Sequence, residues 1–347
     1  MKRIIGIIAL CTLGTTLNAQ ELETVHSIVV VRHEASWYET QLGLWKAEVD
    51  KNGQNAEAWY NYYSACRALR NLAWEDEEKQ SEYGKQCTAI AESAYAAIPK
   101  TFEGNHLMYW DGGRKADPKY LKKAFEVSPN DPRIFDDILI EGELTRDTKK
   151  FHDMAVRIHE ANEMPGAMLN WAYNILSELD SNSIVLSAGD NDTYALWLTQ
   201  EVLGVRKDVQ VINTSLIFME DYRKLLFTEL GLPAFELDEM QSNGDAMFEH
   251  ILNNTKGIPA YVSVSAIRQF NEKPIMENLY LTGLAYKYSQ DSFDNMSLIR
   301  RNYEKRFLTD HLVMNFSAHK ANGRAIHFKS LYLPMLIKLY KHYFLSE

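Results

Sequence analysis

Apolar side chains recur every three or four positions through the middle of the chain, and this spacing predicts a series of helices. Within residues 56–72, the aromatic residues Trp59, Tyr62 and Tyr63 follow this spacing. The pattern continues, with short polar breaks, from residue 37 to residue 179. Because helices joined by short breaks pack side by side, this region is predicted to form antiparallel helical hairpins.

Two parts of the helical region resemble each other. Residues 47–59 can be aligned with residues 125–135 at an offset of 76–78 positions, with a two-residue gap. This offset is close to two periods of a helical repeat, and both segments resemble a tetratricopeptide junction of helix, Asn-containing turn and helix. The resemblance implies a groove that binds a protein or peptide, which we place at Trp59, Tyr62 and Tyr63. A helical bundle without repeats is the alternative.

Short apolar runs from residue 180 onward predict strands. In chain order they are residues 183–188, 208–213, 260–264 and 280–288, the last interrupted by Gly283. The amphipathic segment 194–203 joins the first two runs into a βαβ unit with parallel strands. The predicted fold class is therefore α+α/β. It combines an N-terminal antiparallel helical-hairpin, tetratricopeptide-like array over 37–179 with a small α/β module over 180–347.

The first nineteen residues have the order of an export signal. Lys2 and Arg3 precede an apolar run over residues 4–13, which has the length of a signal-peptide core and is too short to span a bilayer. Ala19 then provides a small residue before a cleavage site ahead of Gln20. We predict a signal peptide and a mature protein in the periplasm or otherwise outside the cytoplasm. A buried N-terminal strand or helix is the alternative.

No later run is apolar over eighteen residues, so we expect no transmembrane segment in the mature chain. An extended segment over residues 20–36 is expected to lead into the first helix.

Two cysteines follow the predicted leader, Cys66 and Cys87, and both fall on predicted helices. An oxidising compartment permits a disulfide between them. Each also fits the role of a small, buried apolar residue. The sequence leaves these interpretations open, and no CxxC motif or paired histidine supports a metal site here.

Charge narrows the classes of partner. The 347 residues include 37 Lys and Arg and 47 Asp and Glu, a net charge of -10, and removal of the leader makes it -12. Neutralising phosphates requires clustered positive charge, so we expect no nucleic-acid partner. The hydrophobic share of 46% and charged share of 24% are those of an ordinary globular protein.

The sequence Gly-Asp-Asn-Asp-Thr at residues 189–193 directly follows the first predicted strand, where open α/β sheets bind ligands. The candidate ligand-binding residues are Asp190, Asn191, Asp192 and Thr193, since two carboxylates two residues apart offer oxygen ligands to a divalent cation. In the alternative interpretation these residues form a turn, and Asp192 or Thr193 caps the next helix.

Known catalytic motifs do not match the chain. No GxSxG, HExxH or phosphate-binding loop occurs. The Asp-rich segment has Glu201 at the twelfth position of a calcium loop counted from Asp190, but Ala195 stands at the sixth position, where such a loop needs Gly. We therefore predict no catalytic residue and no cofactor, and the sequence does not settle whether a metal binds.

Three segments in the second half carry a family resemblance: residues 189–197, 200–209 and 211–216. They resemble the soluble C-terminal region of a bacterial membrane family related to protein O-mannosyltransferases, and the similarity extends over about residues 165–290. The multi-span part expected to hold that family's transfer site has no counterpart here. The resemblance implies a shared module outside the cytoplasm and not the transferase activity, and it gives no catalytic residue that can be carried over to this chain.

Two functions follow from these features. The first is a non-enzymatic, exported scaffold of the cell envelope whose helical-repeat groove binds a protein or peptide. The second is an enzyme or transferase accessory that handles a glycan or nucleotide sugar at residues 189–193.

Overall fold

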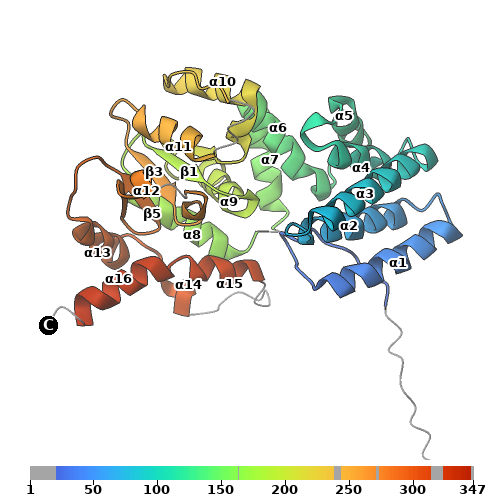
Figure 1. The fold of residues 1–347 in the computed structure, drawn as a ribbon, viewed down its shortest axis with the longest axis horizontal. Coiled ribbons are helices and arrows are strands. Elements are labelled where there is room, and N and C mark those ends of the chain that lie inside the picture. Colours follow the sequence, from blue (N-terminus) through green and yellow to red (C-terminus); the bar gives the residue numbers. More distant parts are fainter. Residues whose placement is uncertain (1–20, 163, 238–243, 271–272, 314–322, 345–347) are drawn as a thin grey trace, which may run out of the picture. The chain divides into compact units, whose positions relative to one another are not determined.

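The residues that the computed structural model describes are 21–162, 164–237, 244–270, 273–313 and 323–344. They group into two compact units: unit 1 contains residues 21–26 and His33–Asp111, and unit 2 contains Ser27–Arg32 and the chain from Gly112 onward (Figure 1). The predicted signal peptide at 1–19 lies outside the described residues, so export stays a prediction. Among the helices of the described ranges, none combines the length and apolar character needed to cross a bilayer.

Unit 1 is an array of packed helices. Its elements are α1 (Ala35–Lys51), α2 (Ala56–Leu72), α3 (Glu77–Ala97) and α4 (Phe102–Gly112). Helix α1 packs on α2, and α2 packs on α3. Residues 21–34 form no helix or strand before α1, and the predicted helix over 56–72 is confirmed as α2.

The two segments that resemble each other in sequence share a backbone turn. At Asn52 and at Ser128, the residue that ends the helix donates its N–H to the carbonyl oxygen four residues earlier. Its own carbonyl then accepts from the N–H three residues later, at 3.0 Å and 3.2 Å respectively. The same two hydrogen bonds occur at Ala73 and Ile98, where α2 and α3 end, so this turn is common to several helix ends and the repeat stays a prediction.

Unit 2 begins with helices and continues as an α/β structure. The helices before the sheet are α5 (Pro118–Val127), α6 (Phe135–Thr145), α7 (Thr148–Glu160) and α8 (Gly166–Glu178), with 3₁₀ turns η1 (Gly113–Lys115) and η2 (Pro132–Ile134). The strands are β1 (Ile184–Ser187), β2 (Gln210–Asn213), β3 (Ala260–Ser263), β4 (Leu279–Leu281) and β5 (Ala285–Tyr288). The remaining helices are α9 (Asp190–Glu201), η3 (Leu216–Phe218), α10 (Glu220–Leu230), α11 (Gly244–Asn253), η4 (Ile267–Gln269), α12 (Lys273–Met276), α13 (Asn295–Lys305), α14 (Asp310–Val313), α15 (Gly323–Ser330) and α16 (Leu333–Phe344).

Across the described ranges, the strands form one mixed five-stranded sheet in the order β2-β1-β3-β5-β4. Strand β1 pairs in parallel with both β2 and β3, so the predicted βαβ unit is confirmed. The predicted strand over 280–288 is a hairpin, because β4 and β5 pair antiparallel on either side of Gly283. The α+α/β fold class is confirmed, whereas the domain division at residue 179 stays a prediction.

The connections place helices on both faces of the sheet. The chain moves from β1 out to β2 and then back past β1 to β3, and right-handed crossovers in opposite directions put their helices on opposite faces. Helix α9 accordingly packs on β2 and α8. Helices α10 and α11 instead join the apolar cluster that contains Ile184, Leu186 and Val262 from the strands.

Candidate functional site

The geometry of the sheet points first to the carboxyl ends of β1 and β3. These strands are neighbours, but the chain leaves β1 toward α9 on one face, and residues after β3, such as Ala266 and Phe270, join the apolar cluster on the other. Open α/β sheets form a ligand-binding crevice where neighbouring connections diverge in this way. The predicted residues 190–193 lie at this position.

The Gly-Asp-Asn-Asp-Thr segment forms the first turn of α9. The helix begins at Asp190, earlier than the expected start at Tyr194, and Gly189 is the N-cap with φ +78° and ψ 167°. Glycine adopts positive φ without a steric penalty, which lets the chain turn sharply from β1 into the helix. The alternative in which Asp192 or Thr193 caps the helix is wrong, because the cap position belongs to Gly189.

The four predicted ligand-binding residues do not share one surface. Asp190 is exposed, Asn191 donates its Nδ2 to the carbonyl oxygen of Val29 at 3.0 Å, and Asp192 and Thr193 are buried. Helical residues two positions apart do not face each other, so Asp190 and Asp192 point in different directions. Among the described residues, no group of three or more His, Cys, Asp or Glu side chains is placed to hold a metal ion.

Thr193 belongs to a hydrogen-bond network that joins β1, β2 and α9. Its Oγ1 lies 3.0 Å from Ser187 Oγ and accepts from Asn213 Nδ2 at 2.9 Å. Asn213 Oδ1 in turn accepts from the backbone N–H groups of Ser215 and Leu216, at 2.8 Å and 3.0 Å. These buried polar groups satisfy one another, so this part of the carboxyl edge is closed.

Asp192 is the chemically unusual member of the edge. The pKa of its carboxyl is raised to about 7, mainly by burial. A hydrogen bond with Ser265 opposes this rise, and the charge of Asp190 adds to it. Ser265 Oγ also lies 2.8 Å from Ser263 Oγ at the end of β3. A carboxyl with a pKa near neutrality can take up or release a proton, which makes Asp192 a candidate for such chemistry.

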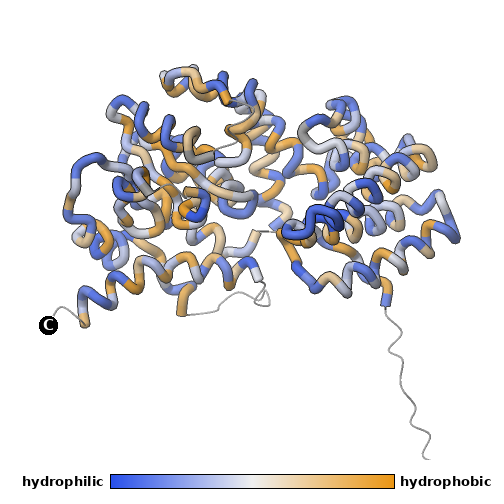
Figure 2. Tube along the Cα trace, in the orientation of Figure 1, coloured by the Kyte–Doolittle hydropathy of each residue, from blue (hydrophilic) through white to orange (hydrophobic). Residues whose placement is uncertain are grey.

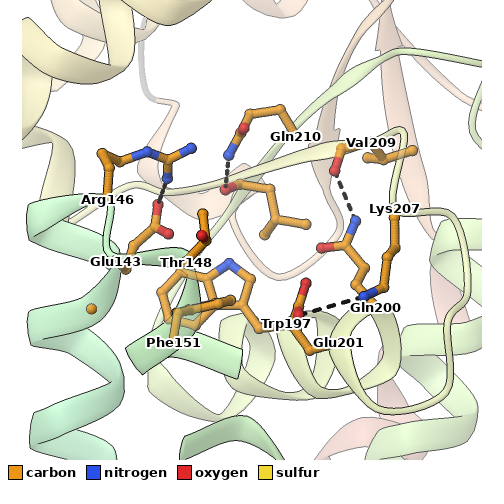
Figure 3. A pocket seen from close by; sticks show the side chains of 12 residues that line it. Glu143, Arg146, Thr148, Phe151, Trp197, Gln200, Glu201, Lys207, Val209 and Gln210 are labelled. Carbon is orange, nitrogen blue, oxygen red and sulfur yellow. Dashed lines mark hydrogen bonds and ion pairs between the residues drawn. The ribbon is translucent and has the colours of Figure 1, made fainter. Parts of the chain in front are cut away.

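A second site, which we call the β2 cleft, opens beside the outer strand of the sheet (Figure 3). It has a volume of about 280 Å³. Its walls come from α6, α7, α9 and the segment that enters β2: Gly142, Glu143, Arg146, Thr148, Phe151, Trp197, Gln200, Glu201, Lys207, Val209, Gln210 and Val211. No residue of this cleft was among the predicted site residues.

Opposite charges alternate around the β2 cleft. Arg146 donates to Glu143 Oε1 at 2.6 Å, and Lys207 Nζ lies 3.5 Å from Glu201 Oε2 (Figure 3). Burial raises the pKa of Glu143, while the charge of Arg146 and a hydrogen bond from Tyr222 oppose that rise. In sequence, Glu143 and Arg146 look like an ordinary i,i+3 pair on a helix surface, so no sequence signal marked them.

The remaining walls are aromatic and amide side chains. The rings of Phe151 and Trp197 meet edge to face at 5.2 Å. Gln210 Nε2 donates to the Val211 carbonyl oxygen at 3.1 Å, and Gln200 Nε2 donates to that of Val209 at 2.7 Å. Glutamine side chains therefore bond carbonyl groups along the outer strand, which protects the sheet edge from pairing with another strand.

The aromatic residues predicted to line a partner groove are buried in unit 1. Trp59 and Tyr62 are less than a tenth exposed, and Tyr63 is fully buried. Trp59 Nε1 donates to the carbonyl oxygen of Gly53 at 2.9 Å, which fixes the ring over the preceding turn. A partner of the array would meet other side chains, and the partner itself stays a prediction.

Cys66 and Cys87 face each other between α2 and α3. Both are buried free thiols, with a distance of 3.0 Å between the Sγ atoms. The hydrogen bond between them and burial raise the pKa of the Cys66 thiol. The pair is placed for either predicted role, and the disulfide stays a prediction.

Part of unit 2 is similar to a known protein family. Residues 168–226 match the model of a family described as TMEM260-associated domain 2, from α8 through β1, α9 and β2 into α10. No match to the chain was found among curated proteins or among solved structures. The matched stretch contains the 190–193 turn and part of the wall of the β2 cleft.

Proposed function

We propose that this protein is an exported, non-enzymatic scaffold of the cell envelope, and that a segment of its protein partner enters the β2 cleft. The helices of unit 1, taken as tetratricopeptide-like, supply a further surface of the kind that binds peptides. The match of residues 168–226 to a TMEM260-associated domain supports a role in association with another protein.

The size and lining of the β2 cleft carry this proposal. A volume of about 280 Å³ lies just below the roughly 300–1,000 Å³ of sites that enclose a drug-sized ligand. It suits one or two side chains of a partner better than a whole nucleotide sugar. The charged pairs Glu143–Arg146 and Glu201–Lys207 give such side chains polar contacts, and Phe151 and Trp197 give an apolar one.

Selection of peptides on the full chain tests the proposal. A displayed library of random twelve-residue peptides is selected on the wild-type protein, and the dissociation constants of the enriched peptides are measured by calorimetry. Thr148→Phe fills the cleft from an exposed wall position, so it should weaken binding at least tenfold. Lys149→Phe is the matched control, because Lys149 is exposed on the same helix and does not line the cleft. Peptides that bind both variants equally would overturn the proposal.

A second function is favoured by Asp192. Its pKa of about 7, its position at the diverging connections and the sequence resemblance support an accessory that handles a glycan or nucleotide sugar at Asp190–Thr193. Titration with Mg²⁺ and a nucleotide sugar tests this function. Binding that Asp190→Ala and Asp192→Ala both abolish would support it, and absence of binding to the wild type would exclude it.

A further inference from the structure

The last helix of the chain carries an unusual exposed apolar face, which we call the α16 stripe. Its members are Leu333, Ile337, Tyr340 and Phe344, and each is more than half exposed. Their spacing of four, three and four residues puts them on one side of the helix. The other side of α16 is anchored in the protein, since Met335 and Leu339 are buried.

The α16 stripe belongs to the structured part of unit 2. Helix α16 packs on α13, where the Tyr343 hydroxyl donates to Glu304 and the Arg300 guanidinium lies over the Tyr343 ring at 5.8 Å. Figure 1 shows α14, α15 and α16 along one side of unit 2, and Figure 2 shows hydrophobic and hydrophilic positions mixed along α16. The fold therefore holds the stripe in place as an outward-facing surface.

The distribution of charged residues along the chain indicates what kind of surface the α16 stripe binds. Residues 295–347 contain nine Lys and Arg and three Asp and Glu, a net charge of +6, whereas the other 294 residues contain 28 and 44, a net charge of -16. Within 323–344 there are four Lys and Arg and no Asp or Glu, and Lys338 and Lys341 are exposed beside the stripe. The C-terminal stretch that contains the exposed apolar helix is thus net positive, whereas the rest of the chain is acidic.

We propose that the α16 stripe binds the surface of an anionic phospholipid bilayer. A helix that lies in a membrane interface combines an apolar face, aromatic side chains at headgroup level and flanking Lys residues, and α16 has all three features. Lys and Arg side chains near an anionic surface add electrostatic attraction to the apolar contact. Contact between the stripes of two copies is disfavoured, because it would bring together the same Lys338 and Lys341 side chains.

Flotation with lipid vesicles tests this inference. The full chain is expressed, and mass spectrometry establishes the same N-terminus for every variant. Binding to vesicles of 70% phosphatidylcholine and 30% phosphatidylglycerol is compared with binding to phosphatidylcholine alone. The wild type should partition at least tenfold better into the anionic vesicles, and binding should fall as salt is raised from 50 to 500 mM.

Two double variants separate the contributions of the apolar and the charged side chains to vesicle binding. Ile337→Glu/Tyr340→Glu and Lys338→Glu/Lys341→Glu should each lose at least tenfold in binding, with thermal unfolding midpoints close to that of the wild type. Leu225→Glu, at an exposed position on α10, is the control and should bind as the wild type does. Equal binding to both lipids, no binding, or binding that the Ile337/Tyr340 variant keeps would overturn the inference. The inference would also be overturned if the wild type formed a dimer, the Ile337/Tyr340 variant were monomeric, and the two bound vesicles equally well.

Discussion

The carboxyl edge of the sheet and the β2 cleft contain similar polar residues but differ in how those residues are used. At the carboxyl edge, Ser187, Thr193 and Asn213 are buried and bond one another across strand ends. In the β2 cleft, Thr148 and Lys207 are exposed, and Lys207 pairs with Glu201 at the rim, whereas Glu143, which pairs with Arg146, is buried. The polar groups between the ends of β1 and β2 are thus used by the protein itself, whereas those of the β2 cleft line an open space.

The largest expected effect is on the pH dependence of stability. Because the pKa of Asp192 is raised to about 7 in the folded state, protonation stabilises the fold. This contribution to stability is complete below the pKa of about 4 that an Asp has in the unfolded chain, and it is lost as pH rises to 7. The free energy of unfolding should therefore fall by at most about 4 kcal/mol over this range. Asp192→Asn should flatten this dependence relative to the wild type in urea unfolding between pH 4 and pH 7.5.

The exposed neighbour provides the control for this prediction. Asp190→Asn should leave most of the dependence in place, since Asp190 only adds to the effect of burial. Parallel curves for the wild type and Asp192→Asn would show that this carboxyl titrates normally in the fold.

Two amide residues on β2 test the contrast between closed and open edges. Asn213→Ala leaves the N–H groups of Ser215 and Leu216 without their acceptor and should cost about 3 kcal/mol of unfolding free energy. Gln210→Ala removes only a bond to the adjacent carbonyl and should cost less than about 1 kcal/mol. Chemical denaturation measures both, and equal losses would remove the distinction between the two edges.

A smaller effect is expected at the centre of the network. Thr193→Val keeps the shape of the side chain but removes the oxygen that accepts from Asn213, so we expect a loss of about 1–2 kcal/mol in thermal or urea unfolding. A variant as stable as the wild type would mean that water or a rearranged Asn213 replaces this oxygen.

The smallest effect is expected in the β2 cleft. Lys207→Ala removes an exposed ion pair with Glu201 at 3.5 Å and should change the unfolding free energy by about 0.5 kcal/mol or less. Urea unfolding checks this value. A loss above about 1 kcal/mol would make Lys207 part of the structural framework, as Asn213 is.

The sequence predicts elements far better than it predicts which side chains are exposed. Helical and strand periodicity located α2 and the strands, because local spacing determines which face of each element is apolar. It did not reveal that Gly189 starts α9 one turn early, since the φ of +78° is visible only in the folded chain.

Candidate sites depend on long-range packing and were harder to predict. Asp192 and Ser265 lie far apart in sequence, and only the order of the strands brings them together. Trp59 and Tyr63 fit a helical face, but the periodicity alone does not show whether that face meets solvent or another helix. The β2 cleft is formed by α6, α7, α9 and β2, which no local pattern connects.

Site-specific photo-crosslinking in cells tests the central claim most directly. A benzoylphenylalanine residue replaces Thr148, which lines the β2 cleft, or Lys149, which is the next residue, is exposed and does not line the cleft. If a protein partner occupies the cleft, irradiation should give a discrete protein adduct from position 148 and little or none from position 149. No adduct at position 148, or equal adducts at both positions, would contradict the proposal that the cleft binds a partner.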